Sequence, residues 1–325
     1  MVNTSVRRLI YVTSQDHART FGDMAQQLRA HGVSARTLSY EKLWGRKFLP
    51  RGTYVLTDFD RLSPVEIEAA GRLHDHLQAA GLRVLNNPRH FRPRDSLLKA
   101  LRAEGINEFT CCLPAAGEWP QRYPVFLRTV AAHRGTLSDL LHDRAVAEAA
   151  LRQAMDQGHP IRDLMFIEYA AEPQPDTGSF QKHAAFRVGR HIVRANTVND
   201  VSWMAKQGAK GVASQAQYEA ERAEMDAYPH HDYVMRVFEF AGLQFGRLDF
   251  GIVTGRPQAY EINTNPTMAL GKAHPHPIRN ETMGLVKSRL ASALADVAQP
   301  VSRCPLFVPE LFRKRFITGH RPRRF

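Results

Sequence analysis

The sequence has few cysteines and no long apolar run. Only three cysteines, Cys111, Cys112 and Cys304, occur in 325 residues, and no two of them have the C-x-x-C spacing. These facts exclude a disulfide framework and a zinc site built on C-x-x-C pairs. No apolar run reaches the roughly 18 residues that a membrane span requires. We therefore expect a protein of the reducing cytoplasm with no membrane partner.

Three loop motifs that would indicate a function are also missing. No G-x-G-x-x-G follows the first expected strand, and G-x-x-x-x-G-K-[ST] occurs nowhere in the chain. This excludes the usual phosphate loops of dinucleotide-binding proteins and of P-loop enzymes. A G-x-S-x-G elbow is absent as well, which argues against a serine hydrolase of the α/β type.

Acidic residues are scarce relative to basic ones. The chain has 44 Lys and Arg against 32 Asp and Glu, which gives a formal net charge of +12. Half of this excess lies in the tail, residues 302–325, where seven basic side chains accompany the single acid Glu310. The rest of the chain is only mildly basic. An anionic small molecule is therefore the expected partner of the body, and nucleic-acid binding through the tail is an open alternative.

Strand and helix patterns alternate over the first ninety residues. Short runs of β-forming residues predict strands, and apolar residues at helical spacing predict helices between them. Gly32 and Gly81 are typical helix stops, and Ser63 followed by Pro64 is a typical helix start. Such alternation predicts a mostly parallel sheet. The expected strands are 8–13, 33–40, 53–57 and 83–86, and the expected helices are 17–31 and 64–80.

After residue 90, longer helices and paired strands are expected. Asp95 is placed to cap one helix, and Thr136 is placed to begin another. Residues 188–190 predict the turn of a hairpin over 180–195. The expected helices are 95–104, 136–155, 215–228, 230–241 and 280–297, and the other expected strands are 123–128, 164–169, 246–252 and 258–262.

Oxygen-bearing side chains gather on the last two expected strands. Asp249 lies on the first of them, and Glu261 and Asn263 lie two residues apart on the second, hence on one face. A register that pairs 248–250 with 260–262 would bring all three oxygens together. Oxygen ligands of this kind suit Mg²⁺. The alternative is a solvated strand face followed by an Asn-rich turn.

This segment resembles the C-terminal signature of the ATP-grasp superfamily, as found in D-alanine–D-alanine ligases. There the pattern is Gly-Arg-x-Asp on one strand and Glu-x-Asn-x-x-Pro-x-Met on the next. The matching residues are Gly246, Arg247, Asp249, Glu261, Asn263, Pro266 and Met268. The resemblance also extends to glutathione synthetase-like carboxylate–amine ligases.

The resemblance implies an α/β protein with the ATP-grasp fold, in which two α+β subdomains clasp ATP behind an N-terminal Rossmann-like parallel α/β domain. We expect this N-terminal domain over 1–92 and a lid subdomain over 93–172. A metal- and substrate-binding subdomain is expected over 173–301, followed by a basic tail over 302–325.

The resemblance also implies roles for individual residues. Asp249, Glu261 and Asn263 would hold two Mg²⁺ ions, with Mn²⁺ as an alternative, and Arg247 and Arg194 would act on the substrate or the transferred phosphoryl group. Glu168 would meet the adenine edge and Glu172 the ribose. Lys99 would stand in for the family's lysine, since Ser96 occupies that position. The expected nucleotide-binding residues are Lys99, Arg128, His133, Gly135, Glu168, Tyr169, Ala170, Glu172 and Lys182.

These residues predict an ATP-dependent ligase. A carboxylate would be activated as an acyl phosphate and then attacked by an amine-type nucleophile, and the lid would move on nucleotide binding. A homodimer is compatible with the sequence. Two alternatives stay open at this point, namely a non-catalytic or regulatory ATP-binding protein and a nucleic-acid-associated protein that acts through the basic tail.

Overall fold

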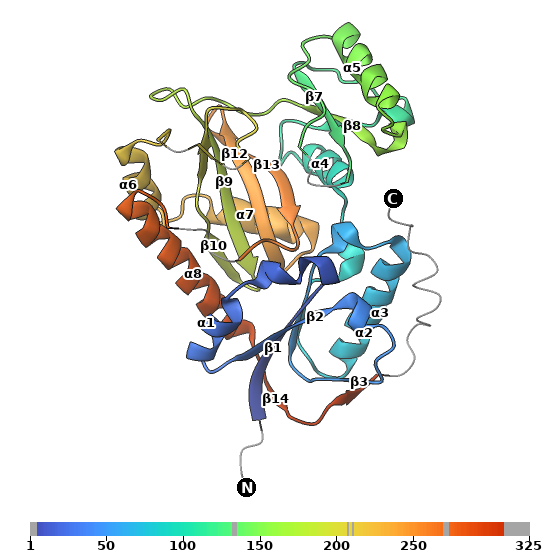
Figure 1. The fold of residues 1–325 in the computed structure, drawn as a ribbon, viewed down its shortest axis with the longest axis vertical. Helices are drawn as coiled ribbons and strands as arrows, with labels where there is room; N and C mark the ends of the chain where they lie inside the picture. Colours follow the sequence, from blue (N-terminus) through green and yellow to red (C-terminus); the bar gives the residue numbers. More distant parts are fainter. Residues whose placement is uncertain (1–4, 132–134, 207, 210, 269–272, 309–325) are drawn as a thin grey trace.

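A computed structural model describes residues 5–131, 135–206, 208–209, 211–268 and 273–308. The chain forms three parts, which Figure 1 shows as a blue N-terminal part, a yellow and orange central sheet, and a green part at the top right. Each part is built around its own sheet.

The N-terminal part is a parallel sheet. β1 (Ser5–Thr13) pairs in parallel with β2 (Ser34–Ser39) and β4 (Thr53–Leu56), and β4 pairs in parallel with β5 (Val84–Leu85). The alternating pattern therefore predicted this sheet correctly. The accompanying helices are α1 (Met24–Ala30), α2 (Tyr40–Leu43) and α3 (Pro64–Ala79).

Local sequence explains where the helices of this part begin and end. α3 begins after Ser63, whose hydroxyl accepts from the Glu66 N–H while the Glu66 carboxylate accepts from the Ser63 N–H. This reciprocal pair satisfies two N–H groups at the start of the helix. The expected helix 17–31 is divided, because a 3₁₀ helix (Gln15–Phe21) ends at Gly22 (φ 57°) before α1 starts.

The central part is an antiparallel sheet in the order β10 (His191–Arg194), β9 (Phe180–Val188), β12 (Phe245–Val253) and β13 (Arg256–Asn263), with β11 (Val198–Asp200) also on β9. α7 (His231–Ala241) packs in the same apolar cluster as Ala185 and Phe250. α8 (Pro277–Val297) packs in a second cluster with Ala184 and Phe186. Because neighbouring strand residues point to opposite faces, the two helices cover opposite faces of the sheet.

The green part lies within residues 93–172, the range over which a lid is expected, and we call it the lid. Its antiparallel sheet has the order β6 (Cys111–Cys112), β8 (Leu164–Glu168) and β7 (Val125–Thr129), with α4 (Arg94–Ala103) and α5 (Arg144–Asp156) beside it. Two predictions in this region are wrong. α4 follows Pro93, so Asp95 lies in its first turn and is not its cap.

The long helix expected from residue 136 begins only at Arg144. Thr136 and Leu141 instead form β-bridges with Arg128 and Val125 on β7. The helix starts after Asp143, whose carboxylate accepts from the Val146 N–H. Pairing with the lid sheet therefore takes precedence over the helical pattern of this segment.

The last described residues return to the N-terminal part. β14 (Pro300–Ser302) pairs antiparallel with β1, and β15 (Leu306–Phe307) pairs with β3 (Phe48–Leu49). Leu306 and Val308 are buried, so the apolar start of the tail docks onto the body.

The remaining elements are short. α6 (Gln215–Ala223) covers the first part of the helix expected over 215–228. Further 3₁₀ turns occur at Phe59–Arg61, Pro88–His90, Pro114–Ala116 and Ile161–Asp163. Within the described ranges, no helix combines the length and the apolar character that crossing a bilayer requires.

Candidate functional site

The β12–β13 hairpin brings the predicted oxygen ligands together. Leu248 pairs with Ile262, Asp249 with Glu261, and Arg247 with Asn263, as predicted, whereas Phe250 pairs with Ala259 and not with Tyr260. A bulge between Asp249 and Phe250 shifts the register that the turn at Thr254 and Gly255 begins, and this shift places Asp249 opposite Glu261. Asp249 and Glu261 are thus direct cross-strand neighbours, and Asn263 lies two residues further along the same face.

Asp249 is a buried carboxylate between two cations. Its side chain is 2% exposed, and its oxygens accept from Arg247 Nε at 2.7 Å and Nη2 at 3.1 Å. Lys182 Nζ lies 3.3 Å from Oδ2. Burial by itself raises the pKa of this carboxyl, but Arg247 and Lys182 outweigh burial and hold the pKa below its ordinary value. The group is therefore ionised at neutral pH.

Glu261 is paired with Arg94, a residue that the sequence analysis did not single out. Arg94 is the first residue of α4, its side chain is only 11% exposed, and Nη2 donates to Glu261 Oε2. Burial lowers the pKa of the guanidinium, whereas the nearby carboxylates of Asp60 and Asp249 raise it. Its position five residues before Lys99 was the only signal available in the sequence.

A cavity opens beside these charges, between the lid and the central sheet. We call it the first cavity. Its polar end contains Asp249, Glu261, Lys182, Arg94 and Arg128. Its other residues are mainly apolar or belong to the end of β8: Leu98, Phe109, Phe126, Ile167, Glu168, Tyr169, Ala170, Ala171, Gln181, Trp203, Met204, Ala205 and Tyr260.

Arg128 is the least satisfied cation of this cavity. Its Nε is buried and has no hydrogen-bond partner among the described residues. Burial, followed by repulsion from Arg94, lowers the pKa of the guanidinium to about 9. Desolvation of the Arg128 guanidinium is unfavourable, and an anionic ligand bound in the cavity would offset this unfavourable free energy.

The end of β8 forms the apolar end of the first cavity. The N–H groups of Glu168 and Tyr169 already donate to Thr110 and Pro124, whereas the Ala170 N–H has no partner among the residues described. The Glu168 carboxylate accepts from Arg122 Nη2 at 2.5 Å and from the Thr110 N–H at 3.1 Å. The backbone at Ala170, rather than the Glu168 side chain, is therefore available to a ligand.

Aromatic rings line the same end, and of these only Tyr169 was expected from the sequence, whereas Phe126, Trp203 and Tyr260 were not. The ring centroids of Trp203 and Phe126 are 4.8 Å apart, and those of Trp203 and Tyr169 are 5.7 Å apart. Tyr260 donates from its hydroxyl to the Ala170 carbonyl at 2.6 Å, which fixes this stretch against β13. A flat heterocycle would fit among such rings.

Three of the predicted nucleotide-binding residues that the structure describes do not line the first cavity, namely Lys99, Gly135 and Glu172. Lys99 Nζ contacts both carboxylate oxygens of Glu118, at 2.7 and 2.6 Å. Glu172 is exposed, and its carboxylate accepts from the Thr254 N–H at 2.6 Å. Lys99 therefore tethers α4 within the lid, and Glu172 tethers the lid to the β12–β13 turn.

Arg194 lies on the opposite face of the central sheet. It pairs with Ala185 on β9, whereas Asp249 pairs with the adjacent Ala184. Because neighbouring strand residues point to opposite faces, Arg194 faces away from Asp249 and from the first cavity. Its guanidinium donates to Glu224 Oε2 at 2.8 Å and to the Ala195 carbonyl at 3.0 Å. The structure thus does not bring Arg194 to the other predicted catalytic residue, Arg247.

The loop after β7 is only partly described. His133 lies outside the described residues. Gly135 has φ of 90°, a left-handed conformation that favours glycine, and a Cβ added there would lie 3.7 Å from Lys206 Nζ. Lys206 therefore adds a further cation close to this loop.

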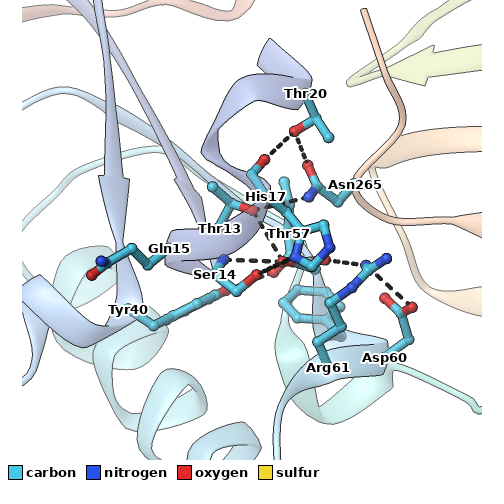
Figure 2. A network of polar contacts seen from close by, with 12 residues as sticks. Thr13, Ser14, Gln15, His17, Thr20, Tyr40, Thr57, Asp60, Arg61 and Asn265 are labelled. Atoms are coloured by element: carbon cyan, nitrogen blue, oxygen red, sulfur yellow. Dashed lines mark hydrogen bonds and ion pairs between the residues drawn. The ribbon is translucent and has the colours of Figure 1, made fainter. Parts of the chain in front are cut away.

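The segment after Asn263 docks onto the carboxyl edge of the N-terminal sheet. Figure 2 shows Asn265 reaching Thr20 and Thr13, and its amide also accepts from the Tyr11 hydroxyl at 2.7 Å. Asn263 Oδ1 accepts from the Asn265 N–H at 2.9 Å. The N-terminal part thus fixes the end of the strand that carries Glu261 and Asn263.

A Ser–His–Asp group in this network does not have hydrolase geometry. Ser14 Oγ contacts His17 Nδ1 at 2.9 Å and also donates directly to Asp58 Oδ2. Asp58 is further paired with Arg61 at 2.5 Å. A catalytic triad needs the histidine between the serine and the aspartate. The absence of a nucleophile elbow in the sequence agrees with this geometry.

The candidate ligands on the β12–β13 hairpin are oxygen atoms, which Mg²⁺ prefers. Over the ranges described here, no group of three or more His, Cys, Asp and Glu side chains is placed to hold a metal ion. The hairpin instead offers two carboxylates and one amide oxygen on one face, from Asp249, Glu261 and Asn263. Oxygen ligands in this number suit Mg²⁺ when phosphate oxygens and water complete its shell. The residues therefore fit the ion.

Comparisons with known proteins find relatives only at the level of structure. No protein-family model matches the chain, and a search of curated sequences finds no match. The ATP-grasp ligase PsnB, complexed with precursor peptide PsnA2 and AMPPNP, is 13% identical with a TM-score of 0.53, covering 92% of this chain and 99% of PsnB.

Two other structures are similar to the same extent. A RimK domain ATP-grasp protein from Sphaerobacter thermophilus is 14% identical with a TM-score of 0.50, covering 89% of this chain and 99% of that protein. D-alanine–D-alanine ligase from Bacillus anthracis is also 14% identical with a TM-score of 0.50, covering 90% of this chain and 97% of the ligase. These three structures share one architecture over almost the whole described chain. The chain therefore has the ATP-grasp fold.

Proposed function

We propose that the chain is an ATP-dependent ligase that activates a carboxylate. One observation carries this proposal: the cations Arg94, Arg128 and Lys182 converge on the Asp249–Glu261 pair at one end of a cavity whose other end is apolar and aromatic. A nucleoside triphosphate has the same division into an aromatic base and a polyanion. The ligands in structures of PsnB, AMPPNP in one complex and Mg with ADP in another, agree with it.

The nucleotide would lie with its base at the end of β8. The Ala170 N–H would donate to the adenine edge, with Tyr169 and Trp203 beside the ring. The phosphates would extend toward Arg128 and Lys182, where charge-assisted hydrogen bonds are strongest because the site is largely desolvated.

Asp249, Glu261 and Asn263 would hold Mg²⁺. When bound, the ion supplies positive charge that neutralises the phosphate oxygens. In the structure Arg94 neutralises Glu261 instead, and Arg247 and Lys182 neutralise Asp249. We infer that Arg94 and Lys182 turn from these carboxylates to phosphate oxygens when the nucleotide binds.

The reaction would proceed by phosphoryl transfer and then acyl transfer. A substrate carboxylate oxygen attacks the γ-phosphorus, which gives an acyl phosphate and ADP. An amine then attacks the acyl carbon and displaces phosphate, with loss of a proton from nitrogen. Such a reaction is accelerated mainly by positioning of the reactants and by stabilisation of the developing negative charge. Arg94, Arg128 and Arg247 would supply both effects, and no general base is required.

The lid must move for the nucleotide to enter. The first cavity encloses about 120 Å³, whereas ligand pockets typically enclose roughly 300–1,000 Å³. Separation of the lid from the central sheet would widen it without disturbing the Asp249–Glu261 register. Hydrogen exchange of β7 and β8 should therefore change on addition of Mg²⁺ and AMPPNP.

The experiment is ADP release measured with a panel of carboxylic acids and amines. Asp249→Asn and Glu261→Gln should each lower acid-dependent ADP release by at least about 100-fold, because a metal-ligating charge is lost. Asp156→Asn, at an exposed position on α5, is the matched control and should leave the rate unchanged.

Two results would contradict the proposal. Unchanged ADP release in both Asp249→Asn and Glu261→Gln would remove the metal-site assignment. Tight binding of Mg²⁺ and AMPPNP, without ADP release from ATP on any acid, would instead favour the non-catalytic ATP-binding alternative.

A further inference from the structure

A second cavity lies on the other side of the Arg94–Glu261 pair. It is bounded by the N-terminal part, the start of α4, the end of β7 and the end of β13, and it encloses about 490 Å³. An apolar cavity of about 150 Å³ is enough to hold a benzene ring. The second cavity therefore has room for a molecule several times that size.

The walls of this cavity are mostly apolar. Phe59, Leu62 and Ile67 come from the N-terminal part, Phe91 precedes α4, and Val130 follows β7. Leu62, Ile67 and Phe91 pack against the main apolar cluster but are only half-buried. Half-buried apolar side chains that line one hollow favour an apolar ligand, because such a ligand removes their surface from water.

The second cavity has four charged lining residues, namely Asp60, Arg92, Arg94 and Glu261. Arg94 and Glu261 line both cavities, so the two cavities meet at this ion pair. Asp60 also lines the second cavity and is close enough to Arg94 to raise the pKa of its guanidinium. A ligand that reaches this end with a carboxylate would meet a guanidinium at the point where the first cavity ends.

We propose that the second cavity binds the carboxylate substrate and selects acids with a bulky apolar body. The identity of the ligand as the reacting acid rests on the proposed ligase function, whereas its apolar character rests on the cavity alone. The Arg94 guanidinium has five N–H donors and lines both cavities, so it binds the acid carboxylate on the side of the second cavity and phosphate oxygens on the side of the first. The apolar body of the acid lies among Leu62, Ile67 and Phe91.

The lining disfavours an acid with a second carboxylate. Apart from Arg92, whose guanidinium lies over the Phe240 ring, the wall away from Arg94 is mainly apolar, with Phe59, Leu62 and Ile67, and burying an unpaired charge is strongly unfavourable. A small acid such as propionate would leave most of the apolar wall in contact with water. A monocarboxylic acid with an aromatic or branched aliphatic group satisfies both requirements.

The direct test is calorimetry on the full chain with simple acids as probes, first without nucleotide and then with Mg²⁺ and AMPPNP. We expect 3-phenylpropionate to bind at least about tenfold more tightly than propionate, since each buried methylene contributes roughly threefold to fourfold. Succinate should bind more weakly than either. The same order should hold for acid-dependent ADP release.

Two substitutions at one position make the test specific. Ile67→Asp places a charge in the apolar wall and should reduce 3-phenylpropionate binding by at least about tenfold. Ile67→Phe keeps the wall apolar but reduces its space, so it should lower the preference for 3-phenylpropionate over propionate. Val146→Asp, at an exposed position on α5, is the matched control.

The outcomes separate this inference from the proposed function. Equal or tighter binding of succinate, or an unchanged preference in a folded Ile67→Phe variant, would overturn the inference even where ADP release persists. Failure of every acid to support ADP release, together with selective 3-phenylpropionate binding that Ile67→Asp abolishes, would contradict the ligase function and leave the apolar-acid site standing.

Discussion

Two arginines at strand ends, Arg128 and Arg194, have opposite environments. Arg194 is 4% exposed and lies between Glu221 and Glu224, and it also donates to the Ala195 carbonyl and the Thr197 hydroxyl. Arg128 is half-buried in the first cavity, and its Nε has no partner among the described residues. Both are cations on sheets, yet only Arg194 is satisfied by the protein itself.

The difference separates a structural charge from one available to a ligand. A buried ion pair whose hydrogen-bonding groups are satisfied contributes to a unique packing, and the loss of one partner leaves the other charge uncompensated. A desolvated cation that lacks a partner and faces a cavity is stabilised when an anion binds to it from solution. The two arginines should therefore respond in opposite ways to the same substitution.

The largest effect is expected for Arg194→Met. Removal of the guanidinium leaves Glu224 without this partner and weakens the surroundings of the buried Glu221, which keeps Arg279. The free energy of unfolding should fall by about 3 kcal/mol, as measured by urea denaturation. Nucleotide affinity at a temperature where the variant is folded should change less than threefold. A large loss of affinity without loss of stability would place Arg194 in the site after all.

The same substitution at the other arginine should act with the opposite sign on stability. Arg128→Met removes a desolvated charge, so the free energy of unfolding should stay the same or rise by about 1 kcal/mol. The affinity for Mg²⁺ and AMPPNP should fall by about 30-fold or more, because a charge-assisted contact to phosphate is lost.

A matched control for this position keeps the charge. Arg128→Lys should retain part of the affinity, since lysine supplies a cation but not the planar fork of donors. Calorimetric titration of each variant measures the binding, and parallel urea curves measure the stability. A destabilised Arg128→Met protein with unchanged affinity would show that this arginine is structural, like Arg194.

The surroundings of Arg194 should also make the free energy of unfolding depend on pH. His183, which stacks on Phe250, lies beside the Arg194 cluster. Burial, and then the positive charges of Arg194 and His230, lower the pKa of its imidazole from 6.5 to about 3. Between these two values the unfolded chain binds a proton that the folded chain does not. The contribution of His183 to stability is therefore complete above pH 6.5 and decreases as the pH falls toward 3.

This contribution can be isolated with one variant. From pH 7.5 to pH 5, His183 should lower the free energy of unfolding by about 2 kcal/mol, from 1.36 kcal/mol for each pH unit below 6.5. His183→Gln should show a correspondingly flatter dependence when urea curves are compared across this range. Parallel curves for the two proteins would show that the imidazole is protonated in the folded state.

The hairpin was predictable from sequence because its constraints are local. A tight turn at Thr254 and Gly255 begins the pairing, and the alternation of side chains places Glu261 and Asn263 on one face. The bulge after Asp249, which shifts the register so that Asp249 pairs with Glu261, has no local signal in the sequence. The side of the central sheet on which Arg194 lies depends on its pairing with Ala185 and on the packing of two helices. No local pattern in the sequence contains that information.

The second cavity was even less predictable from local sequence patterns. Its apolar wall combines Ile67 from α3, Phe91 before α4, Val130 after β7 and Ile262 on β13. Each of these residues, taken alone, is typical of an ordinary core position. Only the arrangement of the three parts brings them around one hollow, so a substrate preference could not be read from their spacing.

The smallest effect is expected at Lys99, where helix geometry decides between two basic residues of α4. Arg94 and Lys99 are five residues apart, which separates them by about 140° around the helix axis, so only one can face the Asp249–Glu261 pair. Arg94 does so, and Lys99 contacts the half-exposed Glu118. Lys99→Ala should therefore change nucleotide affinity less than twofold and lower the free energy of unfolding by less than about 1 kcal/mol.

Arg94→Ala, measured beside Lys99→Ala by calorimetry, should lower nucleotide affinity by at least about tenfold, since a desolvated phosphate contact is lost. A larger loss of affinity at Lys99 than at Arg94 would mean that α4 turns about its axis when the lid closes on the nucleotide.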